Sequence, residues 1–243
     1  LMLASIGDSK SYGGGKKFDD FFKMLIDLEY NKNLVSMGFL VGNEAEFNKI
    51  QNFLTSYYDN LKQFDDSNPA HAGLLKKFIR KVTLIHAPFL EDFDVSRGDR
   101  HNSDVQKRRR RNIARLRNFL LYNALDTERY TLFVDADIIE FHRADTLNYL
   151  IQSGKDIVVP RVQKGSDEDY DRNSWAGERA KPSSEELSLM DENKWNEFKF
   201  VPHDVGGKLK HMYNFYKDPE NVDERNHPEY VVKLDSVGGA VLF

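Results

Sequence analysis

The chain of 243 residues contains no cysteine, which excludes disulfides, thiolate metal sites and catalytic thiols. No run of about 18 apolar residues occurs, so the sequence predicts no membrane-spanning helix. Basic residues are in the minority, with 35 lysines and arginines against 39 acidic residues and a formal net charge of −4. The chain as a whole does not attract polyanions, and any anion-binding site must be a local patch.

What is present suits a globular protein. Hydrophobic residues make up 40% of the chain and charged residues 30%, which argues against disorder. The length suits one large domain or two small ones. Both ends of the chain, 1–6 and 237–243, are apolar and look like strand interiors. Since natural termini are usually exposed and polar, this predicts a fragment of a longer protein.

Strand-like apolar runs alternate with amphipathic helical segments through the first two thirds of the chain. The predicted strands are 1–5, 34–41, 81–87, 130–137 and 156–162. The predicted helices are 18–28, 44–58, 105–125 and 144–151. This alternation predicts an α/β fold, a doubly wound sheet with helices on both faces.

The pattern changes after about residue 165. The segment 165–226 is polar but contains both tryptophans and several other aromatic residues, which a pure linker would not carry. We expect it to form an excursion over the sheet edge, after which a strand at 230–234 returns to the sheet. The chain therefore divides into 1–162 and 163–243.

Asp135-Ala136-Asp137 follows the apolar run that ends at Val134. Mg²⁺ and Mn²⁺ prefer carboxylate oxygens and keep other coordination positions for water or phosphate. Ligands in α/β sheets usually bind at the carboxyl ends of strands. The tripeptide indicates either a metal–diphosphate site or a strand followed by a solvated acidic turn, and on its own it favours the turn.

The helix predicted before this strand opens with a basic run, Lys107–Arg111. Its exposed stripe contains Arg111, Arg115 and Asn118, whereas Arg117 projects among apolar residues on the opposite side. A core-facing arginine needs an anionic partner, either a sheet carboxylate or a ligand phosphate. A nucleic-acid-binding face is the hypothesis from another class. The acidic net charge and the lack of a known nucleic-acid-recognition motif argue against this hypothesis.

Other polar segments carry weaker signals. Gly13-Gly14-Gly15 lacks the lysine–hydroxyl ending of a P-loop and the spacing of a dinucleotide fingerprint, so a flexible loop is predicted there. Asp8, after the first strand, is expected to cap a turn rather than to contact a ligand. The seven histidines are scattered, with no zinc-binding pair.

Several blocks together resemble glycosyltransferase family 62, the fungal mannan-polymerase mannosyltransferases. They lie in order over most of the chain: RRRRNIARLRNFLL at 108–121, VDADI at 134–138, DIVVP at 156–160, YDRNSW at 170–175 and LDSVGG at 234–239. The start of the chain, 3–12, departs from the proline-containing version of this family and looks closer to the partner-subunit branch. The family continues beyond the last block, so the resemblance also implies truncation at the C-terminus.

The resemblance implies a GT-A fold with a Rossmann-like mixed sheet over residues 1–243, nucleotide-binding in 1–162 and acceptor-side in 163–243. It implies retaining transfer of mannose from GDP-mannose to the α-1,6-mannan backbone of an N-glycan acceptor, with Mn²⁺ or Mg²⁺ as metal. It also implies a type II membrane protein of the Golgi, its lumenal domain here and its anchor before residue 1. The partner is a related subunit of a polymerase complex. No nucleic-acid partner is expected.

The implied site has three parts. Asp135 and Asp137 are the metal-binding and catalytic residues. The donor side contains Ser5, Asn43, Arg111, Arg115, Arg117 and Asn118. The sugar or acceptor side contains Asn173, Trp175, Asp235, Gly238 and Gly239. The alternative is a subunit of the same complex that supports catalysis without performing it, and this fragment is expected to bind poorly or be inactive if the missing segment is needed.

Overall fold

The computed structural model describes most of the chain, and the described residues are 1–62, 78–89, 103–165, 168–169, 174–177, 183–192, 194, 210–217, 231–238 and 241–243. The chain forms two compact units. The first contains Leu1–Val158 and Ala240–Phe243, and the second contains Val159–Gly239. Because the last residues belong to the first unit, the second is an insertion before the final strand.

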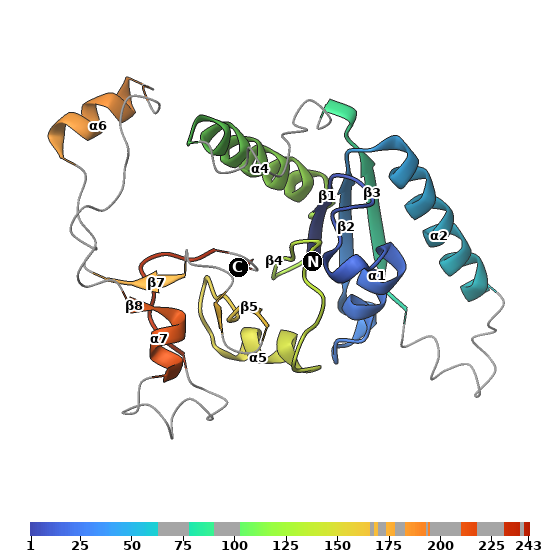
Figure 1. Ribbon diagram of the computed structural model, residues 1–243. Helices are drawn as coiled ribbons and strands as arrows, with labels where there is room; N and C mark the ends of the chain where they lie inside the picture. Colours follow the sequence, from blue (N-terminus) through green and yellow to red (C-terminus); the bar gives the residue numbers. More distant parts are fainter. Residues whose placement is uncertain are drawn as a thin grey trace. The chain divides into compact units, whose positions relative to one another are not determined.

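The first unit is built on a five-stranded sheet with the order β3-β2-β1-β4-β9. Figure 1 labels β1, β2, β3 and β4 of this sheet. Its strands are β1 (Met2–Ile6), β2 (Ser36–Val41), β3 (Lys81–His86), β4 (Leu132–Phe133) and β9 (Val241–Leu242). The first four are parallel, and β9 pairs antiparallel with β4. This mixed sheet with helices confirms the predicted α/β, Rossmann-like fold.

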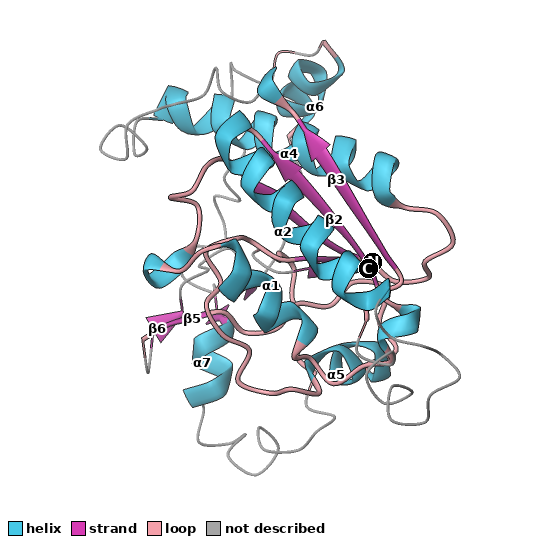
Figure 2. Cartoon of the chain, turned by 90° about the vertical axis from the view of Figure 1, so that its right-hand side faces the viewer, coloured by secondary structure: helices cyan, strands magenta, loops and turns pink. Residues whose placement is uncertain are grey.

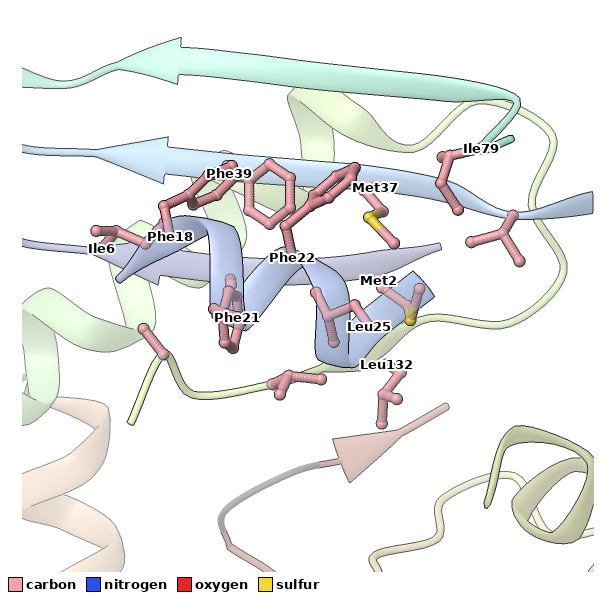
Figure 3. Close-up of a cluster of buried hydrophobic side chains, with 14 of the residues drawn as sticks. Met2, Ile6, Phe18, Phe21, Phe22, Leu25, Met37, Phe39, Ile79 and Leu132 are labelled. Atoms are coloured by element: carbon pink, nitrogen blue, oxygen red, sulfur yellow. The ribbon is translucent and has the colours of Figure 1, made fainter. Parts of the chain in front are cut away.

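One face of the sheet is covered by α1 (Phe18–Ile26), α2 (Glu44–Lys62) and α5 (Thr146–Gln152). Apolar residues recur on one side of α1 at helical spacing, and Phe18, Phe21, Phe22 and Leu25 are all buried. They pack on side chains of β1 and β2, as Figure 3 shows for Met37 and Phe39. Figure 2, turned so that α2 faces the reader, shows the long strands β2 and β3 beside it.

The opposite face is covered by α4 (Ser103–Ala124). Leu120 and Ala124 of this helix are buried with Leu3 of β1. Every residue of β2 is buried, as expected for a strand covered on both faces. Two short 3-10 turns, η1 (Gly13–Gly15) and η2 (Lys32–Leu34), lie in described connections of this unit.

Two strand predictions in the first unit are corrected. β4 is two residues long instead of covering 130–137, because the chain turns at the Asp135 position. The predicted strand 156–162 is reduced to one bridge, in which Val158 and Leu242 exchange both backbone hydrogen bonds at 2.9 Å. Pro160 follows two residues later and has no N–H to extend the pairing.

The second unit has short elements. β5 (Gln163–Lys164) pairs with β6 (Glu168–Asp169), β7 (Trp175–Ala176) pairs with β8 (Lys210–His211), and the helices are α6 (Ser184–Asp191) and α7 (Met212–Lys217). The strand predicted at 230–234 is not found over residues 231–234, and pairing begins only at Ser236. No helix in the described part of the chain is both long and apolar enough to cross a membrane.

Candidate metal and nucleotide site

The strand order places the candidate site between β1 and β4. From β1 the sheet grows through β2 and β3 in one direction, and the chain then returns to add β4 on the other side of β1. In open α/β sheets, ligands bind outside the carboxyl ends of the strands at such a reversal. The residues that follow β1 and β4, including Asp135 and Asp137, lie at this edge.

Asp135, Ala136 and Asp137 form a tight turn and do not continue the strand. The last ladder bond runs from the Val134 N–H to the Leu3 carbonyl at 2.9 Å, and the Ile138 N–H then donates to the Asp135 carbonyl at 3.1 Å. Ala136 is buried, while Asp137 is exposed. The turn therefore places its two carboxylates outside the sheet, with the alanine between them fixed in the core.

Arg117 of α4 is paired with the first of these carboxylates. Its Nη2 lies 2.7 Å from Asp135 Oδ1, and its guanidinium lies over the Phe133 ring at 5.3 Å from the centroid. Both partners are partly exposed, with side-chain exposures of 29% for Arg117 and 49% for Asp135. The sequence left open whether Arg117 pairs with a sheet carboxylate or with a ligand phosphate. In the structure it pairs with the sheet carboxylate of Asp135.

Ser5, near the end of β1, is a neighbour of the same turn. Leu3 of β1 is in register with Phe133 of β4, and continuing that register by two residues places Ser5 beside Asp135. The Ser5 hydroxyl is buried and has no hydrogen-bond partner among the described residues. A buried polar atom without a partner costs roughly 1–3 kcal/mol, so this hydroxyl is suited to contact a bound molecule.

Asn43 has a different contact from the one predicted. It precedes α2, and its Oδ1 accepts from the Glu46 backbone N–H at 3.0 Å, which caps the helix. The backbone N–H of Asn43 donates to the Gly7 carbonyl at 2.9 Å. The side-chain oxygen of Asn43 is therefore used within the fold, and the nucleoside contact stays a prediction.

The three other donor-side candidates lie on the outer surface of α4. Arg111, Arg115 and Asn118 are all exposed. At about 100° per residue, Arg115 lies nearly opposite Arg117 around the helix axis. The structure thus brings Arg117, and not Arg115, to the Asp135 carboxylate, and the nucleotide contacts of the exposed residues stay predictions.

The acceptor-side candidates belong to the second unit. Trp175 exchanges backbone hydrogen bonds with the 235–236 segment, and the Asp235 carboxylate accepts from the Gly177 N–H at 2.8 Å. The Gly238 N–H donates to the Ser174 hydroxyl at 3.3 Å. Trp175, Asp235 and Gly238 are therefore brought together within this unit, whereas Asn173 and Gly239 lie outside the described residues.

The candidate metal ligands fit a hard cation with open coordination positions. No group of three or more histidine, aspartate or glutamate side chains that could hold a metal occurs in the part of the chain that the structure describes. Asp135 and Asp137 supply oxygen ligands at an accessible turn, and Mg²⁺ or Mn²⁺ is commonly bound by one or two carboxylates together with phosphates and water. The donor set therefore fits such an ion shared with a diphosphate.

The triple glycine is a part of the site that the sequence did not identify. Instead of a flexible loop, Gly13–Gly15 is a 3-10 turn whose first residue packs against the Asp137 backbone. The turn before it is capped as predicted, since Asp8 Oδ1 accepts from the Lys10 N–H at 2.8 Å. The three glycines are visible in the sequence, but nothing in the sequence indicates that Gly13 contacts Asp137, which lies more than 120 residues away.

These features define a class: an α/β domain with an acidic turn at the carboxyl edge of its sheet. Within this class the chain belongs to the Anp1 family, whose model matches residues 1–243. The predicted membership of the mannan-polymerase family is thereby confirmed.

Three relatives illustrate the similarity. The chain is 26% identical over 233 residues to the mannan polymerase complex subunit mnn9 of Schizosaccharomyces pombe, covering 93% of this chain and 62% of that protein. It is 28% identical over 163 residues to the mannan polymerase II complex anp1 subunit of the same yeast, covering 64% and 35%. It is 27% identical over 230 residues to the mannan polymerase II complex ANP1 subunit of Saccharomyces cerevisiae, covering 90% and 41%. The chain thus spans less than two thirds of each of these relatives.

Proposed function

We propose that this chain is the donor-binding domain of a metal-dependent mannosyltransferase. It uses GDP-mannose and extends the α-1,6-mannan backbone of N-glycans with retention of configuration. The observation that carries the proposal is the Asp135–Asp137 turn at the carboxyl edge of β4, beside the end of β1. The names of the relatives, which are subunits of mannan polymerase complexes, supply the substrate class.

The residues have distinct roles in this proposal. Asp137 is exposed and holds the metal ion, and Asp135 contributes through the oxygen that Arg117 does not occupy. Mn²⁺ or Mg²⁺ held by these carboxylates would supply positive charge against the negative charge that develops on a leaving diphosphate. The Ser5 hydroxyl donates to the bound nucleotide, which satisfies its missing hydrogen bond. Trp175 and Asp235 have the predicted role on the acceptor side.

The setting of the protein is part of the proposal. Its partner is a related subunit in a mannan polymerase complex, as the names of the relatives suggest. Its location is the Golgi lumen, with the membrane anchor outside the described residues. Fractionation of cells with an antibody to the chain, combined with protease protection, tests the location: cleavage only after the membranes are opened is the expected result.

Isothermal titration calorimetry of the full-length protein with GDP tests the donor site. We expect binding that requires Mn²⁺ and is at least tenfold weaker in Asp137→Asn, because one of two metal carboxylates is lost. The matched control is Asp126→Asn, which removes the same charge at the amino edge of the sheet, where Asp126 lies 3.9 Å from Lys81. Equal GDP binding in the two variants would contradict the metal assignment.

The second candidate function is a supporting subunit without catalytic activity. The Arg117–Asp135 ion pair favours it, because a carboxylate already neutralised by an arginine is a poorer metal ligand. An assembled complex in which only this subunit carries Asp137→Asn separates the two functions. Loss of mannan elongation supports the transferase, whereas unchanged elongation supports the supporting role.

A further inference from the structure

The 3-10 turn after β1 is packed against the acidic turn after β4. A Cβ atom added to Gly13 would lie 2.2 Å from the Asp137 carbonyl oxygen and 2.7 Å from the Ile139 Cγ2 atom. Real Cβ atoms do not come this close to other atoms, and a backbone carbonyl is not free to move aside as a side chain is. The backbone of Asp137 therefore rests directly on the Gly13 position.

A second contact joins the same two turns. The Lys16 ammonium group donates to the carbonyl oxygen of Ile139. Gly13 and Lys16 thus contact the chain at and just after Asp137, from one short segment. Contacts at both Asp137 and Ile139 restrain the direction of the chain after β4 as well as its position.

The segment that makes these contacts is itself fixed to the core. The buried Tyr12 hydroxyl donates to Glu46 Oε1 of α2 at 2.9 Å, and both side chains are at most 7% exposed. The Ser11 hydroxyl accepts from the backbone N–H groups of Gly7 and Asp8 at 3.0 and 3.1 Å. The segment that contacts Asp137 is therefore itself bonded to α2 and to the residues that directly follow β1.

We propose that the segment Ser11–Lys16 is a positioning element for the metal site, with Gly13 and Lys16 setting the place of Asp137. This inference rests on the proposed function, since it assigns a purpose to the fixed position of Asp137. β4 has only two residues, and the last ladder bond, from the Val134 N–H to the Leu3 carbonyl, lies three residues before Asp137. Neither Gly13 nor Lys16 contacts the ligand in this assignment; they act through the Asp137 backbone.

Mn²⁺ affinity, measured by electron paramagnetic resonance of free Mn²⁺ with the full-length protein, tests the role of Gly13. In Gly13→Ala the added methyl displaces the Asp137 backbone, and we expect Mn²⁺ affinity at least tenfold below the wild type. The matched control is Gly15→Ala. Gly15 has φ of +71° and no neighbour within 4 Å of an added Cβ, so this variant strains the same turn without pushing on Asp137. It should melt at a lower temperature yet bind Mn²⁺ within twofold of the wild type.

Lys16→Met provides a test that does not depend on the folding of Gly13→Ala. Removing a positive charge that contacts the chain just after the acidic turn should by itself strengthen Mn²⁺ binding. Loss of the contact with the Ile139 carbonyl should weaken it, and the positioning role predicts a net decrease of at least threefold. Unchanged or tighter binding in Lys16→Met would overturn the positioning role, as would wild-type affinity in Gly13→Ala. A wild-type protein that binds no Mn²⁺, with or without GDP, would instead contradict the proposed function.

Discussion

The Asp135 carboxylate has two competing partners at the residue scale, the Arg117 guanidinium and the proposed metal ion. The guanidinium lies 2.7 Å from Asp135 and packs on Phe133, so it is held in place by two contacts. An arginine in this position neutralises one of the two carboxylates of the turn, which lowers the repulsion between them. The same charge opposes the approach of a divalent cation.

Replacing Arg117 with methionine should raise the affinity for Mn²⁺ alone by roughly three- to tenfold, since Asp135 is released and a nearby positive charge is removed. The variant should also lose about 1–2 kcal/mol of stability with the ion pair and the ring contact. Mn²⁺ titration and urea unfolding measure the two effects. Arg115→Met is the control, because it removes the same charge from an exposed position of the same helix. An equal rise in both variants would mean that net charge, and not release of Asp135, controls the affinity.

At the scale of elements, α4 carries Arg117 to the site because it packs closely on the sheet. A Cβ added to Gly38 of β2 would lie 2.9 Å from the Ala124 Cβ and 2.6 Å from Leu3 Cδ2. Two small residues, Gly38 on the strand and Ala124 on the helix, therefore permit the close approach. The distance between this helix and the sheet sets where the guanidinium lies relative to β4.

Gly38→Ala should push the C-terminal end of α4 away from the sheet and destabilise the protein by about 1–3 kcal/mol, the usual cost of overpacking. Urea unfolding followed by circular dichroism measures this loss. Compensation is expected from Ala124→Gly, which opens space on the facing helix at the cost of helix propensity. A single variant as stable as the wild type would show that α4 does not pack as closely as the structure indicates.

The elements that the sequence predicted well are those whose periodicity is strong. The apolar side of the predicted helix 18–28, with Phe21, Phe22 and Leu25, identifies both α1 and its buried face. The short strand β4 was predicted too long, because an apolar run says where a strand can lie and not where its partner stops. The strand ends at a turn in which the Ile138 N–H donates to the Asp135 carbonyl, and no local sequence pattern indicates this bond.

The candidate site was predicted in part, for a similar reason. The Asp135–Asp137 pair is a local signal, and the structure places it directly after the end of a strand, while its metal-binding role stays a prediction. The contact between Gly13 and Asp137 joins residues far apart in the chain, and glycine carries no side chain to suggest a partner. Arg117 was identified as needing an anion, but only the packing of α4 on the sheet decided which one.

At the scale of the whole molecule, the two edges of the first unit's sheet differ in chemistry. The carboxyl edge has the Asp135–Asp137 turn. The amino edge has a hollow of about 300 Å³, whose lining includes Arg80 and Glu128. The Glu128 side chain is only 4% exposed and lies 3.1 Å from Arg80 and 3.7 Å from Lys81. This carboxylate ties the segment before β4 to the start of β3.

Glu128, at the amino edge, should make the stability of the fold depend on pH. Burial by itself would raise the pKa of Glu128, but the nearby Ser36 hydroxyl, the backbone N–H groups of Asp126 and Glu128, and the Lys81 charge lower it to about 2. The pKa is thus lower in the folded chain than the ordinary 4.5. The ionised group therefore stabilises the fold above about pH 4.5, and this contribution is lost as the pH falls towards 2.

Glu128→Gln should consequently lower the free energy of unfolding at pH 7 by up to about 3 kcal/mol and flatten its decline between pH 4.5 and 2. Urea unfolding at a series of pH values measures both. Glu140→Gln serves as the control, because Glu140 is exposed and its 3.8 Å contact with the His142 imidazole is open to solvent. Parallel pH profiles for wild type and Glu128→Gln would show that Glu128 does not contribute in this way.

The proposed function requires a divalent ion that binds at the turn after β4 and faces a nucleotide diphosphate. Anomalous diffraction at the manganese edge, from crystals of the protein grown with Mn²⁺ and GDP, tests it most directly. We expect a peak within coordination distance of an Asp137 carboxylate oxygen, about 2.0–2.5 Å, with the diphosphate on its other side. A manganese peak elsewhere, with GDP bound away from this turn, would rule out the proposed metal site.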